Sequence, residues 1–175
     1  VLRYYLNSVH YRNDFNFNEE DLLTAKKRLD KLYRLKKRVS PGKASAVNKI
    51  FKKAILDAMS DDLNISIALA VIDDMVATTN DAFDTNPKDK ALKKETLANI
   101  AFIDTLLGFG GKEPFSYFQI GVDDALKEKI EALLSERSEA KKEKNYERSD
   151  AIRDELTALG ISIMDTPDGT LWEKA

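Results

Sequence analysis

The chain has 175 residues, of which 43% are hydrophobic and 33% are charged, and its formal net charge is −2. No apolar run approaches the roughly 20 residues that a membrane helix needs, and the first residues show no signal-peptide pattern. Cysteine is absent and His10 is the single histidine, which excludes disulfides and thiolate metal sites and argues against zinc chemistry or histidine-based catalysis. We therefore expect His10 to be a hydrogen-bonded structural residue.

The first residue is Val1 rather than methionine, and it lies inside the apolar stretch VLRYYLNSV. We expect the chain to be a piece of a longer protein. An active site absent from these residues would then lie upstream of them.

Segments of helical period fill the first two thirds of the chain. The expected helices cover about residues 1–10, 18–39, 44–59, 65–83 and 88–107. Asn18 and Asn64 are placed to cap the second and fourth of these helices, because an asparagine side chain accepts hydrogen bonds from free backbone amides. Four long amphipathic helices with short connections predict an antiparallel bundle.

The segment GFGGKEP at residues 108–114 contains three glycines and one proline, which indicates a domain boundary. We expect a helical bundle domain at residues 1–112 and a small mixed α/β domain at residues 113–175. The fold class is mainly α: an antiparallel helical bundle, followed by a small α+β tail with two helices and a C-terminal β-hairpin. The two tail helices are expected at about residues 123–143 and 146–159.

The predicted hairpin consists of ISIMD and TLWEK on either side of the turn sequence TPDG. Gly160 fits the left-handed position that ends the preceding helix, while proline and glycine suit the turn. A lone hairpin is marginally stable in water, so this one must pack on helices. The helix residues expected to cover it are Ile152, Leu156 and Leu159, against Ile161, Ile163 and Trp172.

The segment KKRLDKLYRLKKR at residues 26–38 holds eight basic residues and one acidic residue. The stripe opposite its apolar face contains Lys27, Lys31, Arg34 and Arg38. One interpretation is an ordinary solvated helix face. The alternative is contact with a phosphate backbone, which positions a nucleic acid without reading its sequence.

A second polar face is expected on the helix before the hairpin. It contains Tyr146, Asp150, Arg153 and Thr157 in a narrow sector. Unstacked RNA bases are recognised by such groups, because rings stack on bases, carboxylates accept from base amino groups and arginine contacts base edges or phosphate. The alternative is a solvated face with an Asp150–Arg153 pair worth a few tenths of a kcal/mol. Asp165 either joins this site or braces the turn.

Four stretches, LRYYLNSVHYR, DDLN, DAIRDELTALGI and DTPDGTLWEK, occur in an order that resembles the C-terminal half of bacterial cysteinyl-tRNA synthetase. The resemblance implies a class I enzyme that joins cysteine to tRNA(Cys) by way of an ATP-derived cysteinyl-adenylate. The family's catalytic domain, with its ATP and Mg²⁺ site and its Zn²⁺ ligands, precedes the region present here. This piece should therefore contain no catalytic or metal residues and be inactive alone.

The resemblance further implies that the tail is an anticodon-binding domain. By position, the anticodon-reading groups fall on Lys141, Tyr146, Asp150 and Asp165. Tyr146 stands where some relatives have tryptophan, and Lys141 where they have arginine. Lysine lacks a bidentate fork, so phosphate contact is expected at Lys141 instead of base-edge reading. Arg153 joins the candidate set from the helical projection alone, and the stripe at residues 26–38 rests on its charge alone.

The resemblance also implies that the full-length protein is a cytoplasmic monomer without a membrane partner. Two other readings remain at this point. One is a helical protein-interaction module that does not bind RNA. The other is a related ligase that joins cysteine to an amino-sugar precursor, against which the tail sequence GISIMDTPDGTLW argues, because those relatives lack it.

Overall fold

The structure is a computed structural model that describes residues 1–166 and 169–174. Contacts between Cα atoms divide it into two compact units, Val1–Lys112 and Glu113–Ala175. Helices dominate the described residues, and two antiparallel strands end the second unit, which confirms the predicted fold class.

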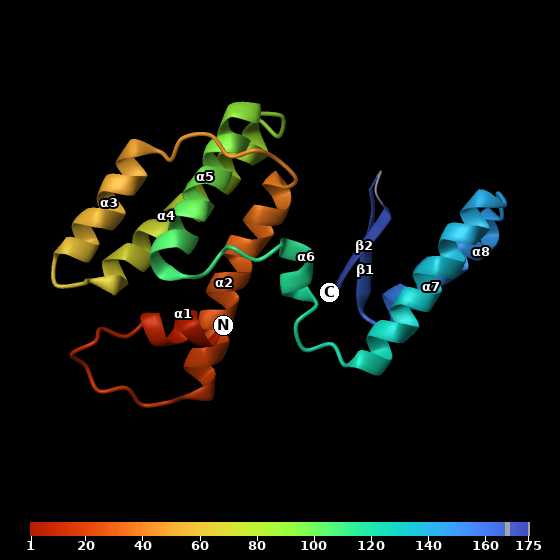
Figure 1. The fold of residues 1–175 in the computed structure, drawn as a ribbon, viewed down its shortest axis with the longest axis horizontal. Coiled ribbons are helices and arrows are strands. Elements are labelled where there is room, and N and C mark those ends of the chain that lie inside the picture. The colour runs from red at the N-terminus through yellow and green to blue at the C-terminus, as the bar shows by residue number, and fades with distance from the viewer. Residues whose placement is uncertain (167–168, 175) are drawn as a thin grey trace. The chain divides into compact units, whose positions relative to one another are not determined.

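In its described residues the first unit consists of helices joined by two longer connections, residues 8–18 and 40–48, and two short ones, residues 61–64 and 86–89. The helices are α1 (Leu2–Asn7), α2 (Glu19–Val39), α3 (Lys49–Ser60), α4 (Ile65–Thr85) and α5 (Lys90–Leu107). Helix α2 packs against α1, α4 and α5, while α3 packs against α4 and α5. Figure 1 shows α2 to α5 running alternately up and down, as in an antiparallel bundle. The most deeply buried side chains of the first unit include Leu32, Leu35, Ile55, Leu69, Ile72, Ile100 and Ile103.

Asparagine caps fix two of these helix starts, as predicted. The Asn18 side chain accepts a hydrogen bond from the Glu20 amide at 2.8 Å, and that of Asn64 accepts from the Ile67 amide at 3.3 Å. Each cap satisfies a backbone donor that has no partner inside the helix.

Two predicted helix ends were wrong. The first helix ends at Asn7 instead of near residue 10, and both the amide and the hydroxyl of Ser8 donate to the Tyr5 carbonyl there. The third helix begins at Lys49 instead of near residue 44, because Asn48 accepts hydrogen bonds from two amides of the first turn at 3.0 Å each. Helical propensity alone did not reveal these local hydrogen bonds.

The second unit contains α6 (Pro114–Phe118), α7 (Asp124–Lys142), α8 (Tyr146–Ala158), β1 (Ile161–Thr166) and β2 (Gly169–Lys174). The short helix α6 was not predicted, so the described tail has more helix than the two elements expected. Glu113 caps α6 by accepting from the Ser116 amide at 2.7 Å, and Pro114 stands in its first turn. Proline has no amide to lose at a helix start, so a proline taken as a boundary signal also begins a helix here.

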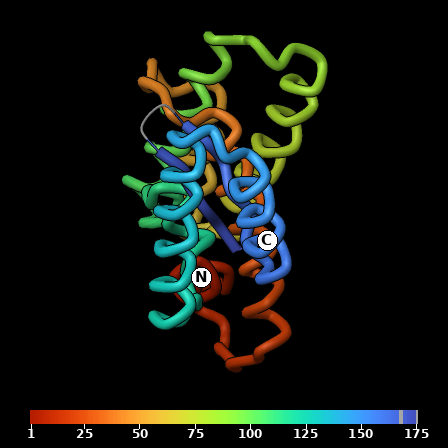
Figure 2. Tube along the Cα trace, turned by 90° about the vertical axis from the view of Figure 1, so that its right-hand side faces the viewer, coloured from red at the N-terminus to blue at the C-terminus, as the bar shows by residue number. Residues whose placement is uncertain are grey.

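Helices α7 and α8 run antiparallel and side by side (Figure 2). The turn between them contains Lys144 at φ 61°, followed by Asn145, which accepts from the Arg148 amide at 3.1 Å. After α8, Gly160 adopts φ 72°, the left-handed conformation expected for it.

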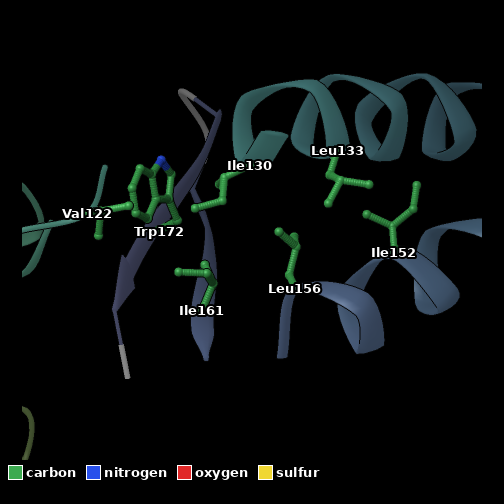
Figure 3. Packing of buried hydrophobic residues seen from close by; sticks show 7 residues of the cluster. All are labelled: Val122, Ile130, Leu133, Ile152, Leu156, Ile161 and Trp172. Carbon is green, nitrogen blue, oxygen red and sulfur yellow. The ribbon is translucent and has the colours of Figure 1, made fainter. Parts of the chain in front are cut away.

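The hairpin pairs Ile163 with Trp172 and Asp165 with Thr170. Gly169 has a positive φ, as the turn prediction required, while Pro167 and Asp168 lie outside the described residues. Side chains of α7, α8 and the hairpin point toward one another in Figure 3. The buried cluster consists of Val122, Ile130, Leu133, Ile152, Leu156, Ile161 and Trp172, with Leu126, Leu134, Leu159 and Ile163 partly buried against it. The expected packing of α8 on the hairpin is confirmed.

Candidate nucleic-acid interface

The outer face of α8 is exposed. Tyr146, the first residue of the helix, has 63% of its surface exposed, and Asp150, Arg153 and Thr157 are exposed as well. Ile152 and Leu156 are fully buried on the opposite face. The geometry of the helical projection is confirmed, whereas what this face binds stays a prediction.

Asp165 on β1 is the centre of a polar cluster that joins both helices to the hairpin. Arg137 of α7 donates to its two carboxylate oxygens at 2.7 and 3.0 Å. Lys141, one turn later, donates to Oδ2 at 2.7 Å, and the Thr170 hydroxyl donates to Oδ1 at 2.8 Å. The Arg153 guanidinium of α8 lies 3.8 Å from Oδ2. Asp165 therefore lies together with two other predicted site residues, Lys141 and Arg153.

These contacts hold the Asp165 carboxyl in its ionised form. Hydrogen bonds from Arg137 and then from Lys141 keep the pKa of Asp165 far below its ordinary value, and together they outweigh the opposing effect of burial. A carboxylate offers about four lone-pair positions. Two donors to each oxygen fill them, so Asp165 has its accepting capacity already in use before any ligand binds.

Sequence reasoning missed Arg137. Only 2% of its surface is exposed, and it belongs to the same stripe of α7 as Ile130, Leu133 and Ala140. An arginine at a position of apolar periodicity is rarely buried without a charged partner. That pattern was a usable signal for an acidic partner, although it did not identify Asp165.

The basic residues of α2 differ from one another in whether they are paired with a carboxylate. Lys27, Lys31, Arg34 and Arg38 are all exposed. Arg38 donates to Asp84 of α4 at 2.6 Å, however, and Arg28 donates to Asp73 of α4 at 2.8 Å. Within α2, Lys26 pairs with Asp30 at 2.7 Å. Acidic residues of the same unit therefore offset part of the local positive charge.

The predicted structural role of His10 agrees with its position. Its Nε2 lies 3.0 Å from the carbonyl oxygen of Asp62, and Tyr11 and Arg12 donate to the Asp62 carboxylate at 2.6 and 3.0 Å. The HYR and DDLN stretches, 50 or more residues apart, therefore meet in space.

The part of the chain described by the structure has no group of three or more histidine, aspartate or glutamate side chains able to hold a metal ion. In the same residues, no helix combines the length and the apolar character that crossing a membrane requires.

Comparison with known proteins identifies the class of the tail. Residues 123–172, which include α7, α8 and most of the hairpin, match the family described as the cysteinyl-tRNA ligase anticodon binding domain. The fold and the exposed polar face thus belong to an anticodon-binding domain.

The relatives that match over the whole chain include cysteine–tRNA ligases. It is 81% identical over 175 residues to a cysteine–tRNA ligase of Sulfurovum sp. (strain NBC37-1), covering 100% of this chain and 38% of that protein. It is 57% identical to that of Aliarcobacter butzleri (strain RM4018) and 55% identical to that of Helicobacter pylori (strain G27), covering 99% of this chain and 37% of each relative. The chain spans less than two fifths of the length of these curated relatives. It is homologous to the C-terminal part of the cysteine–tRNA ligase family.

Proposed function

We propose that this chain is the tRNA-binding part of a cysteine–tRNA ligase and that its second unit binds the anticodon region of tRNA(Cys). The observation that carries the proposal is the exposed face of α8, which presents the ring of Tyr146 beside Asp150 and Arg153 in a segment that matches an anticodon-binding family. We propose further that residues 1–112 and 113–175 act as two domains, a helical strut and an RNA-reading tail.

Tyr146 and Asp150 would contact the bases directly. An exposed ring at the first turn of a helix offers a flat surface on which an unstacked base can lie, and such stacking is worth about 1–3 kcal/mol per base. Asp150, one turn along the same face, would accept a hydrogen bond from an exocyclic amino group. Stacking supplies affinity, and the hydrogen bond supplies discrimination between bases.

Lys141 and Asp165, which pair with each other in the free chain, would each take a partner from the RNA. Asp165 has no free lone pair while Lys141 donates to it, and Lys141 is the partner with 39% of its side chain exposed. An RNA phosphate competes for the lysine ammonium, and its departure frees Oδ2 to accept from a base. Arg153, at 3.8 Å from the same oxygen, would turn to phosphate or to a base edge in the same way.

The rest of a longer enzyme would perform the chemistry. There, ATP with Mg²⁺ would activate cysteine, and Zn²⁺ would be bound by residues outside this chain. The tail would raise the rate of charging only by holding the tRNA in place, since anticodon and acceptor end share no atoms. We also propose a cytoplasmic, monomeric full-length protein.

On α2, the exposed residues Lys27, Lys31, Arg34 and Arg38 would contact the tRNA backbone, and the ion pair with Asp84 would reduce the contribution of Arg38. Such contacts add affinity that falls as salt rises and carries no base preference.

The test is to measure binding of the 175-residue chain to tRNA(Cys) with its GCA anticodon and to the same tRNA with altered anticodons, over a range of salt. We expect binding that weakens with salt and weakens further when the anticodon is changed. Equal binding to all anticodons would contradict base reading by the tail. Absence of tRNA binding at every salt concentration would instead favour a protein-interaction module.

A further inference from the structure

Arg137 is a buried charge inside the small second unit, and its burial needs a reason. We propose that Arg137 is a positioning residue of the RNA-binding face: it fixes the carboxylate of Asp165, so that this group stays in place when Lys141 leaves it. The inference rests on the proposed function of the tail. Arg137 itself would touch no RNA.

The geometry fits a fixed holder. The guanidinium makes two parallel hydrogen bonds to the two oxygens of Asp165, at 2.7 and 3.0 Å. This fork sets the rotation of the carboxylate as well as its position, which a single ammonium cannot do. The side chain reaches from α7 to β1, so the orientation of Asp165 depends on a helix rather than on the hairpin alone.

Burial separates the roles of the cations around Asp165. Arg137 is 2% exposed, and RNA cannot reach it without unfolding the cluster. Lys141 and Arg153 are 39% and 52% exposed, so a phosphate can draw them away. After such an exchange, Asp165 would keep its bond to Arg137 and present Oδ2 outward, still ionised.

Thr170 completes the support from the neighbouring strand. It lies opposite Asp165 in the hairpin register and donates to Oδ1 at 2.8 Å, while Arg137 approaches its hydroxyl at 3.4 Å. Oδ1 therefore accepts from the buried Arg137 and from the neighbouring strand, whereas Oδ2 accepts from Arg137 and from the exposed, displaceable Lys141. Replacement of Lys141 by an RNA base requires this difference between the two oxygens.

The experiment compares the affinity of the full 175-residue chain for tRNA(Cys) with its affinity for a tRNA of altered anticodon. The ratio of the two dissociation constants is the readout. Partial unfolding of the whole chain lowers both affinities by the same factor and leaves the ratio unchanged, and native fluorescence of Trp172 in each variant verifies that its tail is folded. A merely structural role of Arg137 would therefore not move it.

We expect Arg137→Met and Arg137→Lys to lower the ratio by roughly tenfold, the size of one lost base-reading contact, because neither side chain provides the fork. Arg148→Met is the matched control. It removes an arginine from the same unit that pairs with Glu136 at 2.7 Å, and it should change the ratio by less than about twofold.

Asp165→Asn supplies a test that does not depend on how well the Arg137→Met variant folds. Asp165 is exposed, and in its absence Arg137→Lys should lower the ratio no further. A wild-type ratio near one would show that the proposed function is wrong. A high wild-type ratio that survives in the Arg137 variants, or an equal loss in the Asp165→Asn background, would overturn the positioning role alone.

Discussion

Two cationic regions of this chain, the segment of α2 at residues 26–38 and the cluster around Asp165, differ in how their charges are arranged. On α2, basic residues have carboxylate partners of their own, among them Lys26 with Asp30, Arg28 with Asp73 and Arg38 with Asp84. In the tail, cations from two helices converge on one carboxylate. The first arrangement disperses charge, whereas the second concentrates it and fixes its geometry.

This difference separates affinity from recognition. Dispersed surface cations attract a phosphate backbone without regard to sequence, and salt screens them. A carboxylate held by a buried guanidinium, in the same unit as an exposed ring and a second carboxylate, has the fixed directions that base reading needs. We therefore expect α2 to contribute salt-dependent affinity and the tail to contribute anticodon preference.

The largest effect should come from Tyr146→Ala. Loss of the stacking surface should weaken tRNA(Cys) binding by about 1–3 kcal/mol, or roughly 5-fold to 150-fold, and Tyr146→Trp should bind at least as tightly as wild type. Titration of the chain with labelled tRNA measures both. Phe17→Ala, which removes a ring of similar exposure at 62% from the first unit, is the control and should have little effect. An equal loss of tRNA affinity in Tyr146→Ala and Phe17→Ala would contradict a special role of the ring in the tail.

Lys141→Met should have the next largest effect. Loss of one phosphate contact should reduce affinity by roughly fivefold and lower the slope of log affinity against log salt by about one. Lys142→Met is the control, because Lys142 is exposed and is not among the residues that contact Asp165. A salt slope that is unchanged in the Lys141 variant would argue against the exchange with phosphate.

The stability of the tail should depend on Asp165 in a defined direction. Its folded-state pKa is depressed, so it stabilises the fold fully above its unfolded pKa of about 3.9 and less as pH falls below that value. At pH 7, Asp165→Asn should cost about 1 kcal/mol, a value limited by the 42% exposure of the side chain.

Urea unfolding followed by the fluorescence of Trp172, the single tryptophan and a member of the tail core, measures this difference. The gap between wild type and Asp165→Asn should be constant above about pH 5 and narrow below about pH 4. A gap that widens in acid would mean that the ion pairs of Asp165 are not the cause.

The smallest effect is expected on α2. Lys27→Ala with Lys31→Ala should weaken tRNA binding by about two- to threefold at low salt, with no change in anticodon preference. Lys26→Ala is the matched control on the same helix, since Lys26 is paired with Asp30 and should contribute less. A change of anticodon preference in the double variant would contradict the assignment of anticodon reading to the tail alone.

Features encoded locally could be predicted from the sequence. The caps at Asn18 and Asn64, the left-handed Gly160 and the exposed face of α8 each depend on residues within a few positions, and each prediction was confirmed. The resemblance of the whole chain to the C-terminal half of cysteinyl-tRNA synthetase was confirmed as well.

Features that depend on distant partners could not be predicted. The carboxylate that pairs with Arg137 lies 28 residues away, and the one that pairs with Arg38 lies 46 residues away. The number of basic residues along α2 therefore overstated the net positive charge of its surface. The buried Arg137 of α7 was not recognised in the sequence. Which residues read the anticodon stays a prediction.

The central claim is that the face around Asp150 reads base amino groups, and all three bases of the GCA anticodon carry one. The most direct measurement replaces each anticodon base in turn by an analogue without its exocyclic amino group and determines the affinity for wild type and for Asp150→Ala. We predict that at least one analogue binds wild type roughly tenfold more weakly than the unmodified RNA, and that Asp150→Ala no longer distinguishes the two. Equal binding of wild type to all three analogues and to the unmodified RNA would contradict the account.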